Sequence, residues 1–217
     1  GIFLKDAKIT LLSNRLRKRL KALNLEEFSQ YYDYITSLQD KTKELEALLD
    51  VVSTNETYFF RNERQFEALA RHCFSDIVSK KSNKKLRIWS AGCSTGEEPY
   101  TISICVLENK HLFQGWEIKI IATDIAPSVL EFAKDGNYSG RRIEKVSEPL
   151  LKKYFTRNSD NPEVYTVNEN VKELVSFSYL NLFKSKFPED VDVIFCRNVM
   201  IYFDRQHQRE LVGNFYK

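Results

Sequence analysis

The sequence contains few glycines, few prolines and few cysteines for its length of 217 residues. Seven glycines and five prolines leave little room for flexible linkers, and the chain has no repeat or low-complexity segment. The four cysteines show no C-x-x-C spacing, and only three histidines accompany them, which argues against a zinc site. We expect free thiols, which favour a reducing, cytoplasmic compartment.

Long hydrophobic runs are also missing. No apolar stretch approaches the ~18 residues that a membrane span requires, and no signal peptide is recognisable, so we expect no membrane insertion. Hydrophobic residues make up 42% and charged residues 29% of the chain, which is typical of a globular protein. The length suits one substantial domain, or one domain together with a small one.

The net charge of +3 is small, but it is unevenly distributed. Residues 1–23 hold seven lysines and arginines against one aspartate, a net +6 that leaves −3 for the remainder. A cationic helix face favours an anionic partner, although a solvated helix surface is the alternative. Residues 8–23 contain no aromatic side chain, whereas nucleic-acid-binding segments combine basic and aromatic residues, so we do not expect nucleic acid as the partner.

The stretch from Leu86 to Tyr100 predicts a strand, a tight loop at Gly92 and Gly96, and the start of a helix. The loop lacks the dinucleotide fingerprint because Ser94 replaces the second glycine, and no Lys-Ser/Thr pair follows to make a phosphate loop. The next two residues are glutamates, which repel phosphate. The loop therefore suits a ligand with an adenosine-like body and a positive group, as in S-adenosylmethionine, unless the glutamates only complement the helix dipole.

Polar residues follow three further predicted strands. Asp124 ends a strand beginning at Trp116, where it can bind ribose hydroxyls or cap the helix that starts near Pro127. Asn181 follows a strand near residues 176–180, where its amide can bind an adenine edge or cap a turn. A near-continuous apolar strand, residues 191–196, is followed by Arg197 and Asn198.

Two domains are predicted. Residues 1–52 read as three short helices, so residues 1–62 form a helical domain and its linker, and residues 63–217 form an alternating β/α domain. Residues 164–168 and 171–177 alternate like β-strands and predict an antiparallel hairpin, in a small β-subdomain inserted at about residues 156–178. Such an insert either binds a partner or is a decoration without function.

Taken together, five segments resemble the chemotaxis receptor glutamate O-methyltransferases, the CheR family. They are residues 55–61 (NETYFFR), 89–100 (WSAGCSTGEEPY), 122–125 (ATDI), 181–182 (NL) and 194–204 (IFCRNVMIYFD). The resemblance covers nearly the whole chain and includes the basic segment at residues 14–20. It implies a Rossmann-like S-adenosylmethionine-dependent methyltransferase domain with an inserted antiparallel β-subdomain and an N-terminal helical domain.

The resemblance also implies the cofactor contacts, with S-adenosylmethionine as methyl donor and S-adenosylhomocysteine as product. Glu98, more than Glu97, meets the methionine part, and Asp124 holds the ribose. The complete implied set of cofactor-binding residues is Asn55, Thr57, Arg61, Glu98, Asp124, Asn181, Leu182, Arg197 and Asn198.

Arg61 and Tyr202 are the implied catalytic residues, nearest the transferred methyl group. A glutamate acceptor is already ionised at neutral pH, so alignment and desolvation matter more than a strong general base. Arg61 can orient a carboxylate through two parallel hydrogen bonds. Tyr202 can position donor or acceptor, unless it is only a core aromatic. No metal is expected to take part.

The implied acceptors are glutamate side chains on the cytoplasmic methylation helices of chemoreceptors. The basic N-terminal helix, with Arg15, Arg17, Lys18 and Arg19, is the expected docking surface for these helices. The full-length protein is expected to be a monomer. A non-catalytic S-adenosylmethionine-binding sensor or scaffold on the same fold is the alternative function.

Two departures from the family pattern affect these expectations. The family's fold has at least one more central strand and a terminal hairpin beyond the point that corresponds to Lys217. We therefore expect a fragment, an incompletely recorded chain, or a sheet that a partner completes; without completion the strand at residues 191–196 lies at an exposed edge, and activity is in question. Residues 161–170 contain no glycine, which makes docking of a receptor tail peptide on the subdomain less expected.

Overall fold

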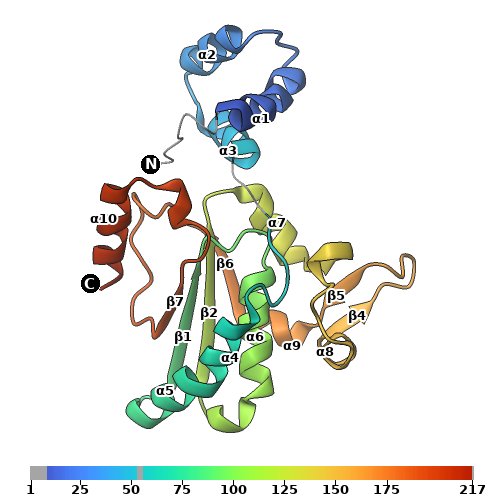
Figure 1. The fold of residues 1–217 in the computed structure, drawn as a ribbon, viewed down its shortest axis with the longest axis vertical. Coiled ribbons are helices and arrows are strands. Elements are labelled where there is room, and N and C mark those ends of the chain that lie inside the picture. The colour runs from blue at the N-terminus through green and yellow to red at the C-terminus, as the bar shows by residue number, and fades with distance from the viewer. Residues whose placement is uncertain (1–8, 53–55, 217) are drawn as a thin grey trace.

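The computed structural model describes residues 9–52 and 56–216 of the chain, which form a small helical domain and a larger α/β domain (Figure 1). The helical domain consists of α1 (Ile9–Ala22), α2 (Phe28–Ser37) and α3 (Thr42–Val52), as the helical spacing of its apolar residues predicted. It lies beyond the carboxyl ends of the main strands, where α3 contacts α7 (Pro127–Asp135) (Figure 1).

A buried carboxylate joins the three N-terminal helices. Glu44 of α3 accepts two hydrogen bonds from Arg19 of α1, at 3.0 and 2.7 Å, and a third from the Tyr31 hydroxyl of α2 at 2.7 Å. Glu44 is only 6% exposed. A buried charge needs such partners because leaving water is costly, so this network fixes the packing of the small domain.

The main sheet contains four parallel strands in the order β6-β2-β1-β7. They are β1 (Lys85–Ala91), β2 (Glu117–Asp124), β6 (Val175–Tyr179) and β7 (Val193–Phe195). In the register of the sheet, Ile88 lies opposite Ile120 on one side and Val193 on the other. β7 is the edge of the described sheet, and it is shorter than the strand predicted for residues 191–196.

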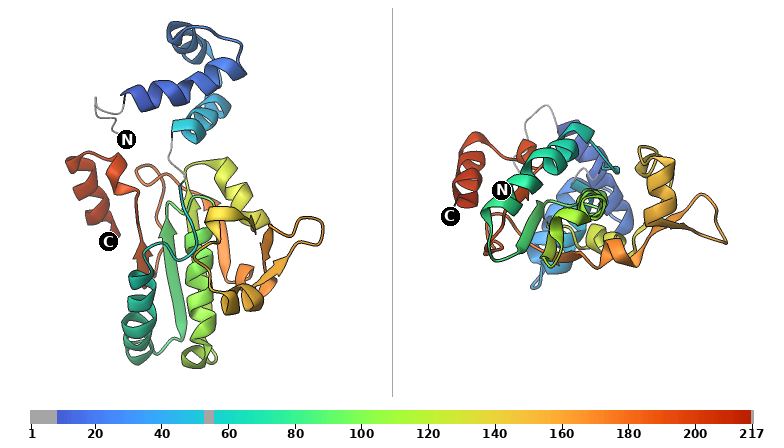
Figure 2. Two further views of the ribbon diagram at one scale, coloured as in Figure 1. Left: turned by 45° about the vertical axis from the view of Figure 1, so that its right-hand side comes forward. Right: turned by 90° about the horizontal axis from the view of Figure 1, so that it is seen from below.

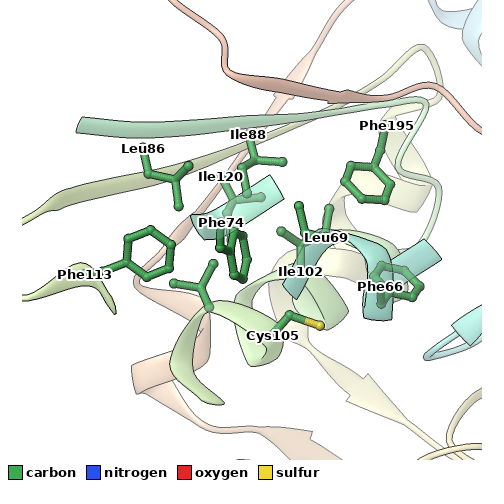
Figure 3. Packing of buried hydrophobic residues seen from close by; sticks show 11 residues of the cluster. Phe66, Leu69, Phe74, Leu86, Ile88, Ile102, Cys105, Phe113, Ile120 and Phe195 are labelled. Carbon is green, nitrogen blue, oxygen red and sulfur yellow. The ribbon is translucent and has the colours of Figure 1, made fainter. Parts of the chain in front are cut away.

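Helices pack against one face of this sheet (Figures 1 and 2), and the loop before β7 packs against the other. One face packs against α4 (Glu63–Ala68), the π-helical turn η2 (Leu69–Cys73), α5 (Phe74–Lys80), α6 (Glu97–Glu108) and the short helix η3 (Lys110–Phe113). Figure 3 shows the core on this side, where Ile88 and Ile120 from the strands meet Phe74 and Ile102 from the helices. On the other face, Trp89 contacts Phe215 of α10 (Arg205–Phe215).

A small antiparallel sheet lies to one side of the main sheet (Figure 2). Its strands are β3 (Asn137–Tyr138), β4 (Phe155–Arg157) and β5 (Tyr165–Val167), in the order β3-β5-β4. The turn η4 (Gly140–Arg142) and α8 (Glu148–Tyr154) connect β3 to β4, and α9 (Glu169–Lys172) follows β5. The predicted subdomain is therefore present, but it begins nearer residue 137 than residue 156.

The predicted hairpin between residues 164–168 and 171–177 is wrong. β5 pairs with β3 and β4, whereas residues 175–179 form β6 and pair in parallel with β2 of the main sheet. Alternation of apolar residues identifies a strand but not the sheet that it joins. Here Phe177 is partly buried against the Tyr100 ring of α6, and this packing favours pairing with the main sheet.

None of the helices in the described ranges combines the length and the apolarity that crossing a bilayer requires. All four cysteines are free thiols, of which Cys93 and Cys105 are buried and Cys73 and Cys196 partly buried.

Candidate active site

The carboxyl ends of the four parallel strands carry most of the predicted site residues. The glycine loop (residues 92–96) follows β1, Asp124 ends β2, Asn181 follows β6 and Arg197 follows β7. The chain runs outward from β1 through β2 to β6 and then returns to place β7 on the opposite side of β1. Open α/β sheets bind ligands outside the carboxyl ends of the strands, where the strand order reverses. The glycine loop and Arg197 flank that point.

Gly92 and Gly96 of the glycine loop each combine a left-handed φ with a close neighbour at the position where a Cβ atom would lie. The Gly92 and Cys93 amides donate to the Thr123 carbonyl at 2.8 and 2.9 Å, which holds the loop against the end of β2. Gly92 has φ +85°, and a Cβ atom there would lie 2.3 Å from a methyl carbon of Val199. Gly96 has φ +94°, and its Cβ would meet Ala133 at 2.8 Å and the Tyr138 hydroxyl at 2.9 Å. Neither position accommodates a larger side chain without strain.

Glu98 and Arg197 face each other across the point where the strand order reverses. Arg197 Nη1 lies 3.3 Å from Glu98 Oε2, close enough for an ion pair but not aligned as a hydrogen bond. The other carboxylate oxygen accepts a hydrogen bond from the Ser90 hydroxyl of β1 at 2.7 Å. The Glu98 and Arg197 side chains are 14% and 12% exposed, so both charges are largely withdrawn from water.

Burial dominates the acid–base properties of this pair. It raises the pKa of the Glu98 carboxyl to about 7, although the hydrogen bond from Ser90 and the charge of Arg197 favour its ionised form. Burial also lowers the pKa of the Arg197 guanidinium, which Glu98 opposes. Among the described residues, Arg197 Nε and Nη1 are buried without a hydrogen-bond acceptor. Such unpaired donors are costly and favour an acceptor supplied by a ligand or by water.

The preceding residue, Glu97, turns the other way. It is fully buried, and its carboxylate accepts hydrogen bonds from Thr95 Oγ1 at 2.7 Å and from Arg142. Burial raises the pKa of Glu97, and the Arg142 charge opposes that rise. Glu97 is thus committed to Thr95 and Arg142, and the contact of Glu98, more than Glu97, with the methionine part stays a prediction.

Asp124 uses both carboxylate oxygens to shape the loops around it. Oδ2 accepts the Ser94 amide of the glycine loop at 2.8 Å, and Oδ1 accepts the Ala126 amide just before α7 at 3.0 Å. Burial raises the pKa of Asp124, and these backbone donors oppose the rise. A carboxylate oxygen accepts more than one hydrogen bond, so the turn-forming role and the predicted ribose role are compatible.

Asn181 caps a turn, which is one of the two roles that its position in the sequence allowed. Its Oδ1 accepts the Phe183 amide at 3.0 Å, which closes a local turn after β6. The neighbouring Leu180 amide donates to the Asp124 carbonyl at 3.0 Å, so this turn sits beside Asp124. Leu182 packs with Trp89 and Phe187 on the face of the sheet that lies away from α6. An adenine contact for Asn181 and Leu182 stays a prediction.

The segment before α4 reaches the site through Arg61. The Arg61 carbonyl accepts a hydrogen bond from Arg197, which joins this segment to the end of β7. The Arg61 side chain folds back so that Nη1 donates to the Glu56 carbonyl at 2.6 Å. Thr57 is partly buried in the same segment, whereas Asn55, predicted to contact the cofactor, lies outside the described residues.

The last two predicted residues lie after β7. Asn198 is exposed and has φ +58°, a left-handed conformation that asparagine tolerates. Tyr202 is partly buried in the short helix η5 (Met200–Tyr202). Gln208 of α10 donates to the Met200 and Phe203 carbonyls at 2.8 and 3.1 Å, which holds this helix at both ends. The proximity of Tyr202 to a transferred methyl group stays a prediction.

Sequence reasoning missed several residues that shape the site. Ser90 orients Glu98, Arg142 pairs with Glu97, and Val199 covers Gly92. A small polar residue in an otherwise apolar strand was a usable signal for Ser90. Arg142 gave no signal, because its partner lies on another element and an exposed arginine, Arg141, stands beside it.

Comparison with known proteins agrees with this geometry. Residues 55–217 match the family domain described as CheR methyltransferase, SAM binding domain, and residues 1–53 match CheR methyltransferase, all-alpha domain. The chain is 39% identical to the chemotaxis protein methyltransferase of Borreliella burgdorferi, an alignment that covers 99% of this chain and 77% of that protein. It is 35% identical to chemotaxis protein methyltransferase 2 of Vibrio cholerae, covering 100% and 75% respectively. With the Salmonella typhimurium chemotaxis protein methyltransferase the identity is 36%, over 99% of this chain and 73% of the relative.

The residues at the carboxyl edge fit S-adenosylmethionine. Its methionine part carries an ammonium and a carboxylate, and the site offers the Glu98 carboxylate together with two buried Arg197 nitrogens that lack a hydrogen-bond acceptor. No phosphate-binding residues accompany them in residues 92–98. The domain matches, the full-length relatives and this donor set agree, and the chain belongs to the CheR methyltransferase family, whose enzymes use S-adenosylmethionine.

Proposed function

We propose that this protein transfers a methyl group from S-adenosylmethionine to glutamate side chains of chemotaxis receptors. The observation that most supports this proposal is the Glu98–Arg197 pair, which lies where the strand order reverses. The pair provides one largely buried charge of each sign. The relatives named as chemotaxis protein methyltransferases supply the class of acceptor.

The residues of the site have distinct roles in this proposal. S-adenosylmethionine, when bound, supplies an activated methyl group. Glu98 binds its ammonium, Arg197 its carboxylate and Asp124 its ribose, while Arg61 orients the acceptor carboxylate. Tyr202, which is partly buried in η5, positions the donor or the acceptor with its hydroxyl. Desolvation strengthens each of these charge interactions, and alignment of donor and acceptor lowers the entropic part of the barrier.

The exposed part of α1 is the proposed receptor-binding surface, and it is narrower than the sequence alone indicated. Arg19 is committed to Glu44, and Arg15 Nη1 donates to the Val52 carbonyl at 2.5 Å. Arg17, Lys18 and Lys21 are exposed. We therefore assign receptor contacts to these three residues, while Arg15 and Arg19 serve mainly to fix α1 on α3.

Two features of the whole protein belong to the same proposal. We place it in the cytoplasm, where its free thiols stay reduced. We also propose that the full-length protein is a monomer, with a helical domain and its linker at residues 1–62 and a methyltransferase domain at residues 63–217. Sedimentation of the full-length protein tests whether it is a monomer. Limited proteolysis tests the domain boundary near residue 62.

Methyl transfer to receptor fragments is the deciding experiment. Cytoplasmic receptor fragments are incubated with this protein and methyl-labelled S-adenosylmethionine, and base-labile label is measured. Fragments whose candidate glutamates are changed to glutamine serve as controls. We expect label only on the glutamate-bearing fragments. Tight binding of S-adenosylhomocysteine without any labelled receptor would support the sensor or scaffold function instead.

A further inference from the structure

Three segments that are distant in sequence meet at Arg142. Its side chain donates to Glu97 at the start of α6 and to the Thr95 hydroxyl of the glycine loop. Its carbonyl accepts the Phe59 amide at 2.9 Å, from the segment that leads to Arg61. Arg142 itself belongs to η4, directly after the first strand of the small sheet.

Further contacts from the same part of the small sheet reinforce this meeting point. The Tyr138 hydroxyl of β3 donates to the Thr95 carbonyl at 2.6 Å. The Phe132 ring of α7 lies against the Arg142 guanidinium, 4.9 Å from its central carbon, and 5.6 Å from the Tyr138 ring. The small sheet therefore contacts the glycine loop directly through Tyr138 and Arg142.

The burial of the two charges is unequal. The Glu97 side chain is 0% exposed, whereas the Arg142 side chain is 34% exposed. If Arg142 is lost, the Glu97 charge remains buried without a cation. If the Glu97 charge is lost, water still solvates Arg142. Breaking a buried pair is most costly when the deeper charge is left alone.

We propose that Arg142 is a positioning residue that holds the glycine loop in its cofactor-binding shape by neutralising Glu97. Thr95 belongs to the glycine loop, and Glu97 is the first residue of α6. The backbone of both residues therefore changes shape when the Arg142–Glu97 pair is broken. Glu98 is the next residue, and its orientation toward Ser90 depends on the same turn of helix. This inference rests on the proposed function, because it assumes that the cofactor lies on the glycine loop.

Four variants of the full chain test the proposal by calorimetric binding of S-adenosylhomocysteine. Arg142→Met removes the cation, Glu97→Gln removes the anion, and Glu97→Gln/Arg142→Met removes both. Arg141→Met is the matched control, because Arg141 is the exposed neighbour and loses the same charge. The KM for S-adenosylmethionine and the kcat are measured in parallel.

The expected pattern is asymmetric. Arg142→Met weakens binding by about 10-fold or more, Glu97→Gln by much less, and the double variant regains most of the affinity that Arg142→Met lost. The change appears in KM and the dissociation constant, with kcat reduced less at saturating donor. Arg141→Met binds like the unaltered protein.

Two outcomes overturn the proposal. Either Arg142→Met binds S-adenosylhomocysteine as the unaltered protein does, or the double variant is no better than Arg142→Met. If Arg142→Met does not fold, Arg142→Lys provides the test: its ammonium keeps the charge that neutralises Glu97, so Arg142→Lys is expected to bind nearly as well as the unaltered protein. A folded Arg142→Lys that loses about 10-fold or more of the affinity also overturns it. If the unaltered protein does not bind the ligand at all, it is the proposed function that fails.

Discussion

Glu98 and Arg197 form an ion pair at 3.3 Å between the start of α6 and the end of β7, and the Ser90 hydroxyl fixes the other oxygen of the Glu98 carboxylate at 2.7 Å. This relationship places the charge of Glu98 at the reversal of the strand order, in a setting where burial raises its pKa to about 7. The charge state of Glu98 is thus sensitive to pH in the neutral range.

Cofactor binding is therefore expected to depend on pH through Glu98. A ligand ammonium favours the ionised carboxylate, so affinity for S-adenosylhomocysteine rises as pH increases through about 7, by about 5- to 10-fold between pH 6 and pH 8. Binding near pH 7 releases a proton, which calorimetry detects as a dependence of the heat on the buffer. Glu98→Gln binds more weakly and without this pH dependence. A Glu98→Gln profile as steep as that of the unaltered protein would contradict the assignment.

The same raised pKa predicts the sign of an effect on stability. Between the ordinary value of 4.5 and about 7, the folded protein binds more protons at Glu98 than the unfolded chain does. The contribution of Glu98 to the free energy of unfolding therefore falls as pH rises through this window. Denaturant unfolding at a series of pH values, compared with Glu98→Gln, measures this contribution. An opposite slope in the difference between the two proteins would show that the pKa is not raised.

Asp124→Ala is expected to weaken both the fold and the cofactor site. It removes the acceptors of the Ser94 and Ala126 amides, at about 1.5–3 kcal/mol for a hydrogen bond to a charged group. S-adenosylhomocysteine should bind at least about 10-fold more weakly if the ribose contact is also lost. Asp124→Asn keeps one acceptor and should recover part of the stability. Unchanged calorimetric affinity in both variants would remove the ribose assignment.

Gly92→Ala tests the close contact between the glycine loop and Val199. The left-handed φ of +85° costs about 1–2 kcal/mol for alanine, and the methyl group also collides with Val199. Gly140→Ala is the control, because Gly140 has φ +56° and nothing within 4 Å of its Cβ position. Gly92→Ala should destabilise the protein more than Gly140→Ala in urea unfolding. Adding Val199→Ala to Gly92→Ala should recover part of the lost stability. Equal losses for both glycines would show that the contact is unimportant.

Arg19→Met is expected to unfold the helical domain selectively. It leaves the Glu44 carboxylate buried with Tyr31 as its remaining hydrogen-bond donor, which costs about 3–5 kcal/mol for a broken buried pair. Amide hydrogen exchange should accelerate in α1, α2 and α3 but not in the main sheet. Arg17→Met, at an exposed position of the same helix, should leave exchange unchanged while weakening receptor binding. Protected helices in Arg19→Met would contradict the structural role of the pair.

Arg61→Ala is expected to affect turnover more than cofactor binding. The Arg61 carbonyl that accepts from Arg197 is retained in the variant, whereas the guanidinium that orients an acceptor carboxylate is lost. Methyl transfer at saturating donor should fall by ~10- to 100-fold, because misalignment of reacting groups has costs of this order. Arg64→Ala, on the exposed side of α4, is the matched control. Full turnover in Arg61→Ala would make Arg61 a structural residue only.

The local features of the site were predictable from the sequence. Gly92 and Gly96 fix the loop because only their conformation and size fit, and the strands that end at Asp124 and precede Arg197 are apolar by necessity. Three N-terminal helices followed from helical spacing alone. These predictions depend on interactions within a few residues, which the local sequence contains. The motif resemblance then supplied the family and the cofactor.

Only the tertiary structure decided which distant residues pair. Val175–Tyr179 joins the main sheet, where Phe177 packs partly buried against Tyr100, although its alternation suited a hairpin equally well. Arg19 binds Glu44 internally, although its place in a basic helix suggested a receptor contact. Glu97 binds Arg142 of η4, whereas Glu98 faces Arg197. Charge and hydrophobicity are properties of single residues, but burial and pairing depend on which segments the folded chain brings together.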